Sequence, residues 1–231
     1  MNLIIKAVFF ILLNTSALFA IEVFDSAKGQ AILNSKSTLS DLPIYTRYMQ
    51  NQQNLAFCGV ASSVIVLNSL GIKGPDFGNP KWKLYPFFTQ DNVFTTAFEK
   101  IIKREEVRKK GMTLAQLSKT LSANGADTAH KHGSEPNFHA EFEKSLLESL
   151  GKKNVYILVN YHRKTLGQDG GGHISPIAAF NPEFKKVLIL DVASYRYPPV
   201  WVDIQKLTKA MKTNDSTSGK MRGFVVIKNK K

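Results

Sequence analysis

The segment GVASSVIVLNSL, residues 59–70, most restricts how this chain can fold. Its content of Val, Ala, Ile and Leu predicts a helix, and the Gly71 that follows is typical of a helix C-cap. Because apolar side chains occupy almost every side of this helix, other parts of the fold must surround it. The sequence therefore predicts a helix buried inside a domain with a sizeable core.

Cys58, which directly precedes this helix, is the only cysteine among the 231 residues. A single cysteine excludes an intramolecular disulfide, and it excludes zinc sites of the Cys₄ or Cys₂His₂ kind. Packing must therefore hold the fold together. The roughly 210 residues that follow the first twenty fit one domain, so we expect a single catalytic domain over residues 21–231.

Residues 1–20, MNLIIKAVFFILLNTSALFA, have the pattern of an export signal. Lys6 supplies the positive charge, an apolar stretch follows, and small residues precede a cleavage site that we expect after Ala20 rather than Ala17. The alternative is a membrane anchor, but the apolar run is shorter than the roughly 20 residues that a span needs. We expect no stable membrane insertion and a protein that is exported, either to a periplasm or out of the cell.

The formal net charge of +13 comes from 31 Lys and Arg against 18 Asp and Glu. The basic residues are spread along the chain and do not alternate with aromatic residues. Such a spread is more typical of a solvated surface than of a nucleic-acid groove. We expect no nucleic-acid partner, and attraction to small anions or to an anionic envelope is the alternative.

Helical patterns come first along the chain, and strand patterns follow. Residues 21–50 show little beyond one short strand. Helices are predicted over residues 89–111, 112–125 and 137–153. Apolar, β-branched segments predict strands over residues 154–161, 173–180, 185–192 and 222–228, of which NPEF joins the middle two as a hairpin. We expect an α+β fold of two packed layers, in which a helical part precedes an antiparallel sheet.

Cys58 is either an ordinary buried thiol or a nucleophile. A free thiol with a pKa near about 8.5 supplies little thiolate at neutral pH, and a helix N-terminus or an imidazolium partner increases that fraction. Cys58 stands where the buried helix begins, and Gly59 is expected to leave room for a substrate beside the sulfur. Most buried free cysteines are inert, so the partners of Cys58 decide between the two interpretations.

His173 has the context of such a partner, whereas His130, His132 and His139 fall in or near a polar loop. GQDGGGHISP places His173 after three glycines at the start of a strand, where they clear backbone space around the imidazole. The predicted hairpin brings Asp191 back beside it. Asp191 can then accept the His173 Nδ1–H and fix the tautomer of the ring.

Gln52, six residues before Cys58, is a candidate for donating a hydrogen bond to an oxyanion, together with the Cys58 backbone N–H. Taken singly, a buried thiol, a strand histidine, an aspartate near a turn and a polar glutamine are all common structural features. Their order, spacing and glycine context together predict acyl transfer at a Cys–His–Asp site.

These residues also carry a family resemblance. The pattern Gln-x₅-Cys at the start of a helix, followed by His and Asp on successive strands, resembles the papain-like cysteine peptidases. The segments NLAFCGVASSVIVLNSLGI, YPFFTQDNVF, GGGHISPIAAF and LDVASYRYPPVWV are similar to the phytochelatin synthase family. The similarity runs over nearly all of the chain after the predicted signal.

The resemblance implies a papain-like fold and a glutathione γ-glutamylcysteinyltransferase reaction. Cys58 would attack the carbonyl that joins γ-glutamylcysteine to glycine, with His173 as base and acid, Asp191 as its orienting group and Gln52 at the oxyanion. Water as acceptor gives γ-glutamylcysteine, and a second glutathione gives phytochelatin. We expect no cofactor and no metal ligands in the protein, with heavy-metal ions acting through glutathione thiolates.

A γ-glutamyl end carries one free ammonium and one free carboxylate, so its pocket needs one anion and one cation. Asp215 and Arg222, seven residues apart before the last strand, are the candidates, because an Arg fork suits a carboxylate. Asn160 and Gly172 are further substrate-binding candidates. The alternative for Asp215 and Arg222 is a surface salt bridge or a turn-capping aspartate.

Two departures from the family shape the hypothesis. Eukaryotic members carry a cysteine-rich C-terminal region, whereas this one-cysteine sequence resembles short bacterial members that favour hydrolysis. Ser194 stands where the family often has Arg, which leaves a contact to the second substrate open, with Arg196 as a substitute. Competing hypotheses are a peptidase acting on other peptides and a non-catalytic protein that binds glutathione or metal thiolates. A homodimer is a further open expectation.

Overall fold

The computed structural model describes residues 21–76 and 86–230, so the predicted export signal lies outside the described residues. The helices are α1 (Ala27–Leu33), α2 (Leu42–Tyr48), α3 (Cys58–Ser69), α4 (Thr96–Glu99), α5 (Arg104–Lys110), α6 (Leu114–Ala123), α7 (Phe138–Ser149), η2 (Arg163–Leu166) and α8 (Ile204–Met211). The strands are β1 (Glu22–Val23), β2 (Leu39–Ser40), β3 (Ala126–His132), β4 (Val155–His162), β5 (Gly172–Asn181), β6 (Lys186–Ile189), β7 (Val200–Asp203), β8 (Asn214–Asp215), β9 (Lys220–Met221) and β10 (Gly223–Asn229). Within these residues no helix combines the length and the apolar character that crossing a membrane requires.

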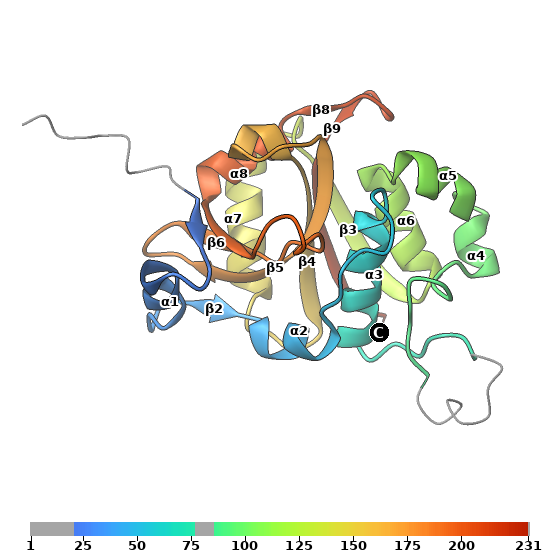
Figure 1. Cartoon of the computed structure of the whole chain (residues 1–231), viewed down its shortest axis with the longest axis horizontal. Coiled ribbons are helices and arrows are strands. Elements are labelled where there is room, and N and C mark those ends of the chain that lie inside the picture. Colours follow the sequence, from blue (N-terminus) through green and yellow to red (C-terminus); the bar gives the residue numbers. More distant parts are fainter. Residues whose placement is uncertain (1–20, 77–85, 231) are drawn as a thin grey trace, which may run out of the picture.

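An antiparallel sheet runs through the middle of the molecule in the order β1-β7-β6-β5-β4-β10-β3, with β2 paired to β5 (Figure 1). The predicted α+β class is confirmed, but the prediction of two layers is wrong. Helices α3 and α6 pack on one face, and α7 and α8 pack on the other. The reason is visible in β4, where Leu158 joins the cluster around α3 while Ile157 and Val159 join the cluster around α7 and α8.

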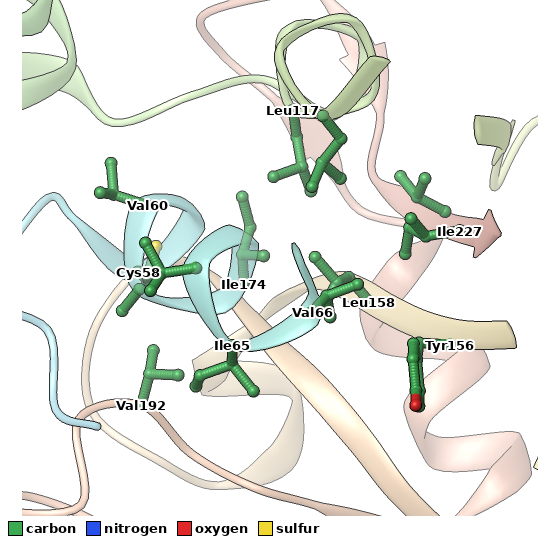
Figure 2. Packing of buried hydrophobic residues seen from close by; sticks show 14 of the residues in the cluster. Cys58, Val60, Ile65, Val66, Leu117, Tyr156, Leu158, Ile174, Val192 and Ile227 are labelled. Atoms are coloured by element: carbon green, nitrogen blue, oxygen red, sulfur yellow. The ribbon is translucent and has the colours of Figure 1, made fainter. Parts of the chain in front are cut away.

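The predicted buried helix is α3, and every one of its residues is buried. Figure 2 shows Cys58 in its first turn and Ile65 and Val66 farther along, with Leu117 and Ile174 packed nearby. Gly71 has φ +69° and ends the helix, and its N–H donates to the Asn68 carbonyl. The sequence-based interpretation of this segment is confirmed, including the role of Gly71.

The prediction of one long helix over residues 89–111 is wrong. The chain forms α4 and α5 instead, and the Thr95 side chain caps α4 by accepting the Phe98 N–H. The buried side chains of this region are Phe98, Ile102 and Val107. A spacing of four and then five residues does not keep three side chains on one face of a continuous helix, so a break lets all three reach the core.

The interpretation of residues 21–50 is also wrong, because two helices of seven residues, α1 and α2, lie there. The Trp201 indole N–H donates to the Gly29 carbonyl of α1, a contact that local sequence does not indicate. His130 and His132, expected in or near a loop, lie on β3, and His139 lies on α7.

The hairpin of β5 and β6 is confirmed, and it carries one irregularity. Phe180 pairs with Val187 and Ala179 with Leu188, but Ile177 pairs with Ile189, so Ala178 is an extra residue in β5. Such an extra residue is a β-bulge. Beyond it the Leu190 N–H donates to the Pro176 carbonyl, which continues the ladder toward Asp191.

Candidate active site

Cys58 is the first residue of α3, with Phe57 as the N-cap and a side chain that is 9% exposed. The first hydrogen bond of the helix runs from the Ala61 N–H to the Phe57 carbonyl, so the preceding N–H groups have no partner within the helix. The Ser62 hydroxyl donates to the Ile174 carbonyl and ties α3 to β5. The thiol is therefore held at a helix N-terminus that is fixed against the central sheet.

His173 lies on β5 opposite Tyr161 of β4 and is 5% exposed. Its Nε2 is 2.8 Å from Oδ1 of Asp191. The prediction that Asp191 pairs with Nδ1 is wrong, and the other ring nitrogen makes this contact. Since Nε2 is engaged by the carboxylate, Nδ1 is the nitrogen left for Cys58, and sequence spacing gives no information about which way a ring turns.

Asp191 follows β6 by two residues and is 1% exposed. Its Oδ1 accepts hydrogen bonds from the Arg163 Nη2 and from the Ala193 N–H, both at 2.8 Å. The Arg163 Nη1 lies 2.7 Å from Oδ2 in an ion pair. The Asp191 carboxylate is thus held between the Arg163 guanidinium and the His173 imidazole.

Arg163 is a residue of the site that the sequence analysis missed. It begins η2 directly after β4, is 4% exposed, and also donates to the Gln168 side chain at 2.9 Å. The available signal was an arginine directly after a buried strand, within NYHRKT. Nothing local connects it to Asp191, 28 residues away, because the register of β4, β5 and β6 makes that contact.

The electrostatics of these groups favour charged forms. Burial raises the pKa of the Asp191 carboxyl, but hydrogen bonds from His173 and Arg163 and their charges outweigh burial, so the net pKa is below its usual range. Burial lowers the pKa of His173, while the Asp191 and Cys58 contacts raise it to a value above the ordinary one. The imidazole is therefore stabilised as an imidazolium.

The Cys58 thiol follows the same logic. Burial raises its pKa, and the hydrogen bond and charge of His173 outweigh burial. Hydrogen bonds from the backbone at Ile174 and Gly59 lower the pKa further, and the net direction is downward. This arrangement can hold a thiolate–imidazolium pair, which is the reactive form of a cysteine nucleophile.

A cavity of about 300 Å³ opens at Cys58. Its lining comes from β4, β5, the β8–β9 segment, the start of α3 with the residues before it, and the end of α5 with the residues after it. The lining residues are Leu55, Ala56, Cys58, Lys109, Lys110, Gly111, Met112, Asn160, Gly172, His173, Ile174, Asp215, Ser216, Thr217 and Arg222. All four predicted substrate-binding residues are therefore in the cavity with Cys58 and His173.

Arg222 is the best-defined cation of the cavity, with 7% exposure. Its Nη1 donates to the Thr213 hydroxyl at 3.1 Å and to the Asn214 carbonyl. Within residues 21–76 and 86–230 it forms no ion pair with a carboxylate. A Cβ on Gly172 would lie 2.9 Å from an Arg222 guanidinium nitrogen, so Gly172 leaves the space that the Arg222 side chain fills.

Asp215 and Asn160 contribute polar atoms to the same cavity. The Asp215 carboxylate accepts the Thr217 N–H and the Ser218 hydroxyl, so it caps the turn of the β8–β9 hairpin as well as lining the cavity. The predicted alternatives for Asp215 are thus compatible with each other. Asn160 is 4% exposed and lies on β4, opposite Ile174 of β5.

Gln52 is close in the chain but is not among the residues that line the cavity. It is 7% exposed, its Nε2 donates to the Asn54 carbonyl at 2.9 Å, and its Oε1 has no hydrogen-bond partner in the described part of the chain. An amide nitrogen carries two hydrogens, so one remains for a further acceptor. The structure leaves the predicted oxyanion role of Gln52 untested.

The expectation that Gly59 leaves room for a substrate is wrong. A Cβ at Gly59 would lie 2.7 Å from the terminal methyl of Met112 and 3.2 Å from Ile174. The missing side chain lets Met112 and Ile174 pack against the first turn of α3. Across the described residues, no group of three or more His, Cys, Asp or Glu is placed to hold a metal ion.

Comparison with known proteins gives a consistent family result. The family model described as phytochelatin synthase matches residues 19–224. Two glutathione gamma-glutamylcysteinyltransferases of Arabidopsis thaliana are each 35% identical over 207 residues, which is 88% of this chain and 41% and 44% of theirs. That of Schizosaccharomyces pombe is 30% identical over 207 residues, 88% of this chain and 48% of its own.

This chain spans less than half the length of these relatives. Among solved structures, a double glycine motif protease from an AMS/PCAT transporter, in complex with the leader peptide, is 14% identical with a TM-score of 0.42. The match covers 79% of this chain and 91% of the protease.

Proposed function

The chain belongs to the phytochelatin synthase family, and from this premise we propose that it cleaves glutathione into γ-glutamylcysteine and glycine. Cys58 forms a thioester with the γ-glutamylcysteinyl group, and glycine leaves. Water then hydrolyses the thioester in the main reaction. Transfer of the acyl group to the amino group of a second glutathione, which makes phytochelatin, is the minor reaction.

One observation carries this proposal: the cavity that holds the Cys58 thiol also holds Arg222 and Asp215. A γ-glutamyl end presents an α-carboxylate and an α-ammonium together, whereas an internal residue of an ordinary peptide presents neither. Arg222 suits the carboxylate, since its guanidinium is buried and has no carboxylate partner among the described residues. Asp215 suits the ammonium, and Asn160 and Gly172 border the same space.

The proposed chemistry starts from the Cys58 thiolate and the His173 imidazolium. The Cys58 thiolate attacks the cysteinyl carbonyl carbon of glutathione, and the negative charge moves to the carbonyl oxygen. The Cys58 backbone N–H and the Gln52 amide donate to that oxygen. As the tetrahedral intermediate collapses, the carbon–nitrogen bond breaks and the His173 imidazolium gives its proton to the departing glycine amine.

The second half of the reaction uses the same groups in reverse. Neutral His173 takes a proton from water, the resulting hydroxide attacks the thioester, and the Cys58 thiolate leaves. Asp191 holds the imidazole through Nε2 throughout, so that the same Nδ1 gives and takes the proton. No redox change occurs, and no cofactor takes part in this proposed reaction.

Ser194 supports water as the main acceptor. Its N–H and hydroxyl both donate to the Asn51 side chain, at 3.0 and 2.6 Å, so this position offers a neutral polar contact where the family often has Arg. Ser194 itself therefore supplies no cation for the carboxylates of a second glutathione. We also propose that heavy-metal ions act through glutathione thiolates. Export to a periplasm or to the cell exterior is a further part of the proposal.

Mass spectrometry of the intact chain after incubation with glutathione tests the proposal. We expect a γ-glutamylcysteinyl adduct on Cys58 and release of one glycine for each γ-glutamylcysteine formed. Cys58→Ala should show neither, and His173→Ala should reduce glycine release nearly as far, while His139→Ala on α7 serves as the matched control. Glycine release that persists in Cys58→Ala contradicts the mechanism.

The same assay separates the competing hypotheses. Cleavage of α-linked Glu-Cys-Gly at the rate of glutathione indicates a general peptidase. Binding of glutathione without adduct or glycine release indicates a non-catalytic binding protein. Preference for the γ-linked peptide, lost in Arg222→Met, supports the proposed recognition of the γ-glutamyl end.

A further inference from the structure

Residues 50–53, which lead to Cys58 and include Gln52, are held from two sides. On the sheet side, the Gln52 N–H donates to the Val192 carbonyl at 2.8 Å, and Ser194 donates to the Asn51 side chain. Both contacts come from the residues that directly follow Asp191. The segment carrying Gln52 is therefore linked to the segment carrying the His173 partner.

On the other side stands Gln90, within the YPFFTQDNVF segment. Its Oε1 accepts the Gln53 N–H at 2.9 Å, and its Nε2 donates to the Asn51 carbonyl at 2.8 Å and to the Gln50 side chain at 2.7 Å. Gln90 is only 1% exposed. Three hydrogen bonds of one buried amide thus converge on the residues on either side of Gln52.

Gln90 is itself anchored to the helix of the nucleophile. Two residues before it, the Phe88 N–H donates to the Asn68 side chain at 2.8 Å, and the Asn68 amide donates back to the Phe88 carbonyl at 2.9 Å. Asn68 belongs to α3. Gln90 is therefore fixed relative to α3, the helix that holds Cys58. Such a link is needed if Gln90 is to align the Gln52 amide with the Cys58 thiol.

We propose that Gln90 is a positioning residue for acyl transfer, which acts by fixing the backbone around Gln52 so that the Gln52 amide and the Cys58 N–H meet the same oxyanion. This inference rests on the proposed function. Gln90 touches neither the cavity nor the thiol, so it acts only through the 50–53 segment. Donors aimed at an oxyanion lose much of their effect when they are displaced by about 1 Å, which gives a remote clamp its importance.

The residue type fits this role. The segment presents one donor, the Gln53 N–H, and two acceptors, the Asn51 carbonyl and the Gln50 side-chain oxygen. A primary amide is the neutral side chain that offers one acceptor and two donors together. Met has nearly the volume of Gln and offers no such hydrogen bonds, so Gln90→Met removes the clamp while keeping the packing.

A double-mutant cycle with Gln52 tests the proposal. Gln52→Ala should lower the turnover number for glycine release roughly 10²-fold, and Gln90→Met should lower it roughly 10- to 100-fold with KM nearly unchanged. If Gln90 acts through Gln52, Gln90→Met in the Gln52→Ala background should change turnover by less than about threefold. Gln205→Met, an exposed Gln→Met change on α8, is the matched control and should have no effect.

Two further measurements keep the outcomes distinct. Alkylation of Cys58 by iodoacetamide should proceed at the wild-type rate in Gln90→Met, because the thiol pair is untouched, whereas a generally disturbed fold would slow turnover and alter alkylation together. If Gln90→Met does not fold, Gln90→Glu keeps the acceptor for the Gln53 N–H and loses both donors, and the same cycle applies to it. Multiplicative losses in the double variant overturn the inference, and a wild-type chain that releases no glycine overturns the proposed function instead.

Discussion

Asp191 beside the cavity and Asp41 before α2 are both buried, with exposed fractions of 1% and 5%. Asp191 receives hydrogen bonds from His173, Arg163 and Ala193, and its pKa lies below the usual range although burial alone would raise it. Among the described residues, the Asp41 carboxylate accepts one hydrogen bond, from the Gly151 N–H at 3.0 Å, and burial raises its pKa to about 7. Burial is common to both, so the donors and cations around each carboxylate decide its charge.

The surroundings of Asp41 show what is missing there. Its Oδ2 and the hydroxyl of the nearby Tyr45 both lack a hydrogen-bond partner within the described residues. Asp41 also precedes α2 without making a side-chain capping bond. The Asp191 carboxylate beside His173 is therefore surrounded by donors and a cation, whereas Asp41 is about half protonated near pH 7.

Replacing Asp191 by Asn should have the largest effect. The amide keeps the shape but loses the negative charge that supports the His173 imidazolium, so glycine release should fall roughly 10²- to 10⁴-fold and remain measurable. The same substitution at Asp41 should leave the rate within about twofold, because no reacting group touches Asp41. Equal losses at both positions would show that the contrast between the two carboxylates has no catalytic meaning.

Arg163→Met should make Asp191 resemble Asp41. Removing one partner of a buried ion pair leaves a buried charge poorly compensated, and we expect the free energy of unfolding to fall by about 3–5 kcal/mol. Urea denaturation at pH 7 measures this loss. Arg163→Lys, which retains a cation but not the fork geometry, should lie between the wild type and Arg163→Met. If Arg163→Met unfolds at the same urea concentration as the wild type, the Arg163–Asp191 ion pair does not contribute to stability.

Asp41→Asn should stabilise the fold. The folded state holds a proton on Asp41 up to a pKa of about 7, whereas an unfolded Asp releases it near about 4. The free energy of unfolding therefore falls as pH rises between those values, and an amide, which does not ionise, avoids this loss. We expect a gain of about 1–3 kcal/mol at pH 8 and little gain at pH 4. Thermal unfolding at both pH values measures it, and a gain that does not depend on pH would speak against titration of Asp41.

The smallest expected effect is on the reactivity of the thiol. Loss of the Asp191 charge lowers the pKa of His173, which weakens the imidazolium and raises the pKa of Cys58. The midpoint of the pH profile for iodoacetamide alkylation should move upward by about one unit in Asp191→Asn. Because Cys58 is the only cysteine, the reagent reports on this thiol alone. An unchanged profile in Asp41→Asn completes the comparison.

The sequence predicted the residues of the site better than it predicted their contacts. The sequence predicts that Cys58, His173 and Asp191 lie together, since a helix start, a run of glycines and a hairpin are local signals, and the structure brings the three side chains together. Arg163 was missed, since its partner depends on the register of three strands. The nitrogen of His173 that faces Asp191 was assigned wrongly, because ring orientation follows from packing around β5 and not from spacing.

The errors in the fold have a similar cause. The seven-residue helices α1 and α2 are too short to be stable on their own propensity. The Trp201–Gly29 hydrogen bond holds α1, and α2 packs against α3 and β5. The break between α4 and α5 follows the core positions of Phe98, Ile102 and Val107 rather than the helix-forming residues between them. By contrast, α3 was predicted well because its own sequence demands burial on all sides.

The bulge at Ala178 determines which face of the sheet the residues beyond it share with their partners on the neighbouring strand. With Ile177 opposite Ile189 and Pro176 bonded to Leu190, Asp191 falls opposite Ser175, whose side chain shares a face of the sheet with His173. Had the register of Phe180 and Val187 continued without the extra residue, Asp191 would oppose Pro176 and point to the other face. The number of residues between His173 and Asp191 therefore matters more than their identity. Repacking can accommodate substitutions in this interval, whereas an insertion or deletion of one residue places the two side chains on opposite faces of the sheet.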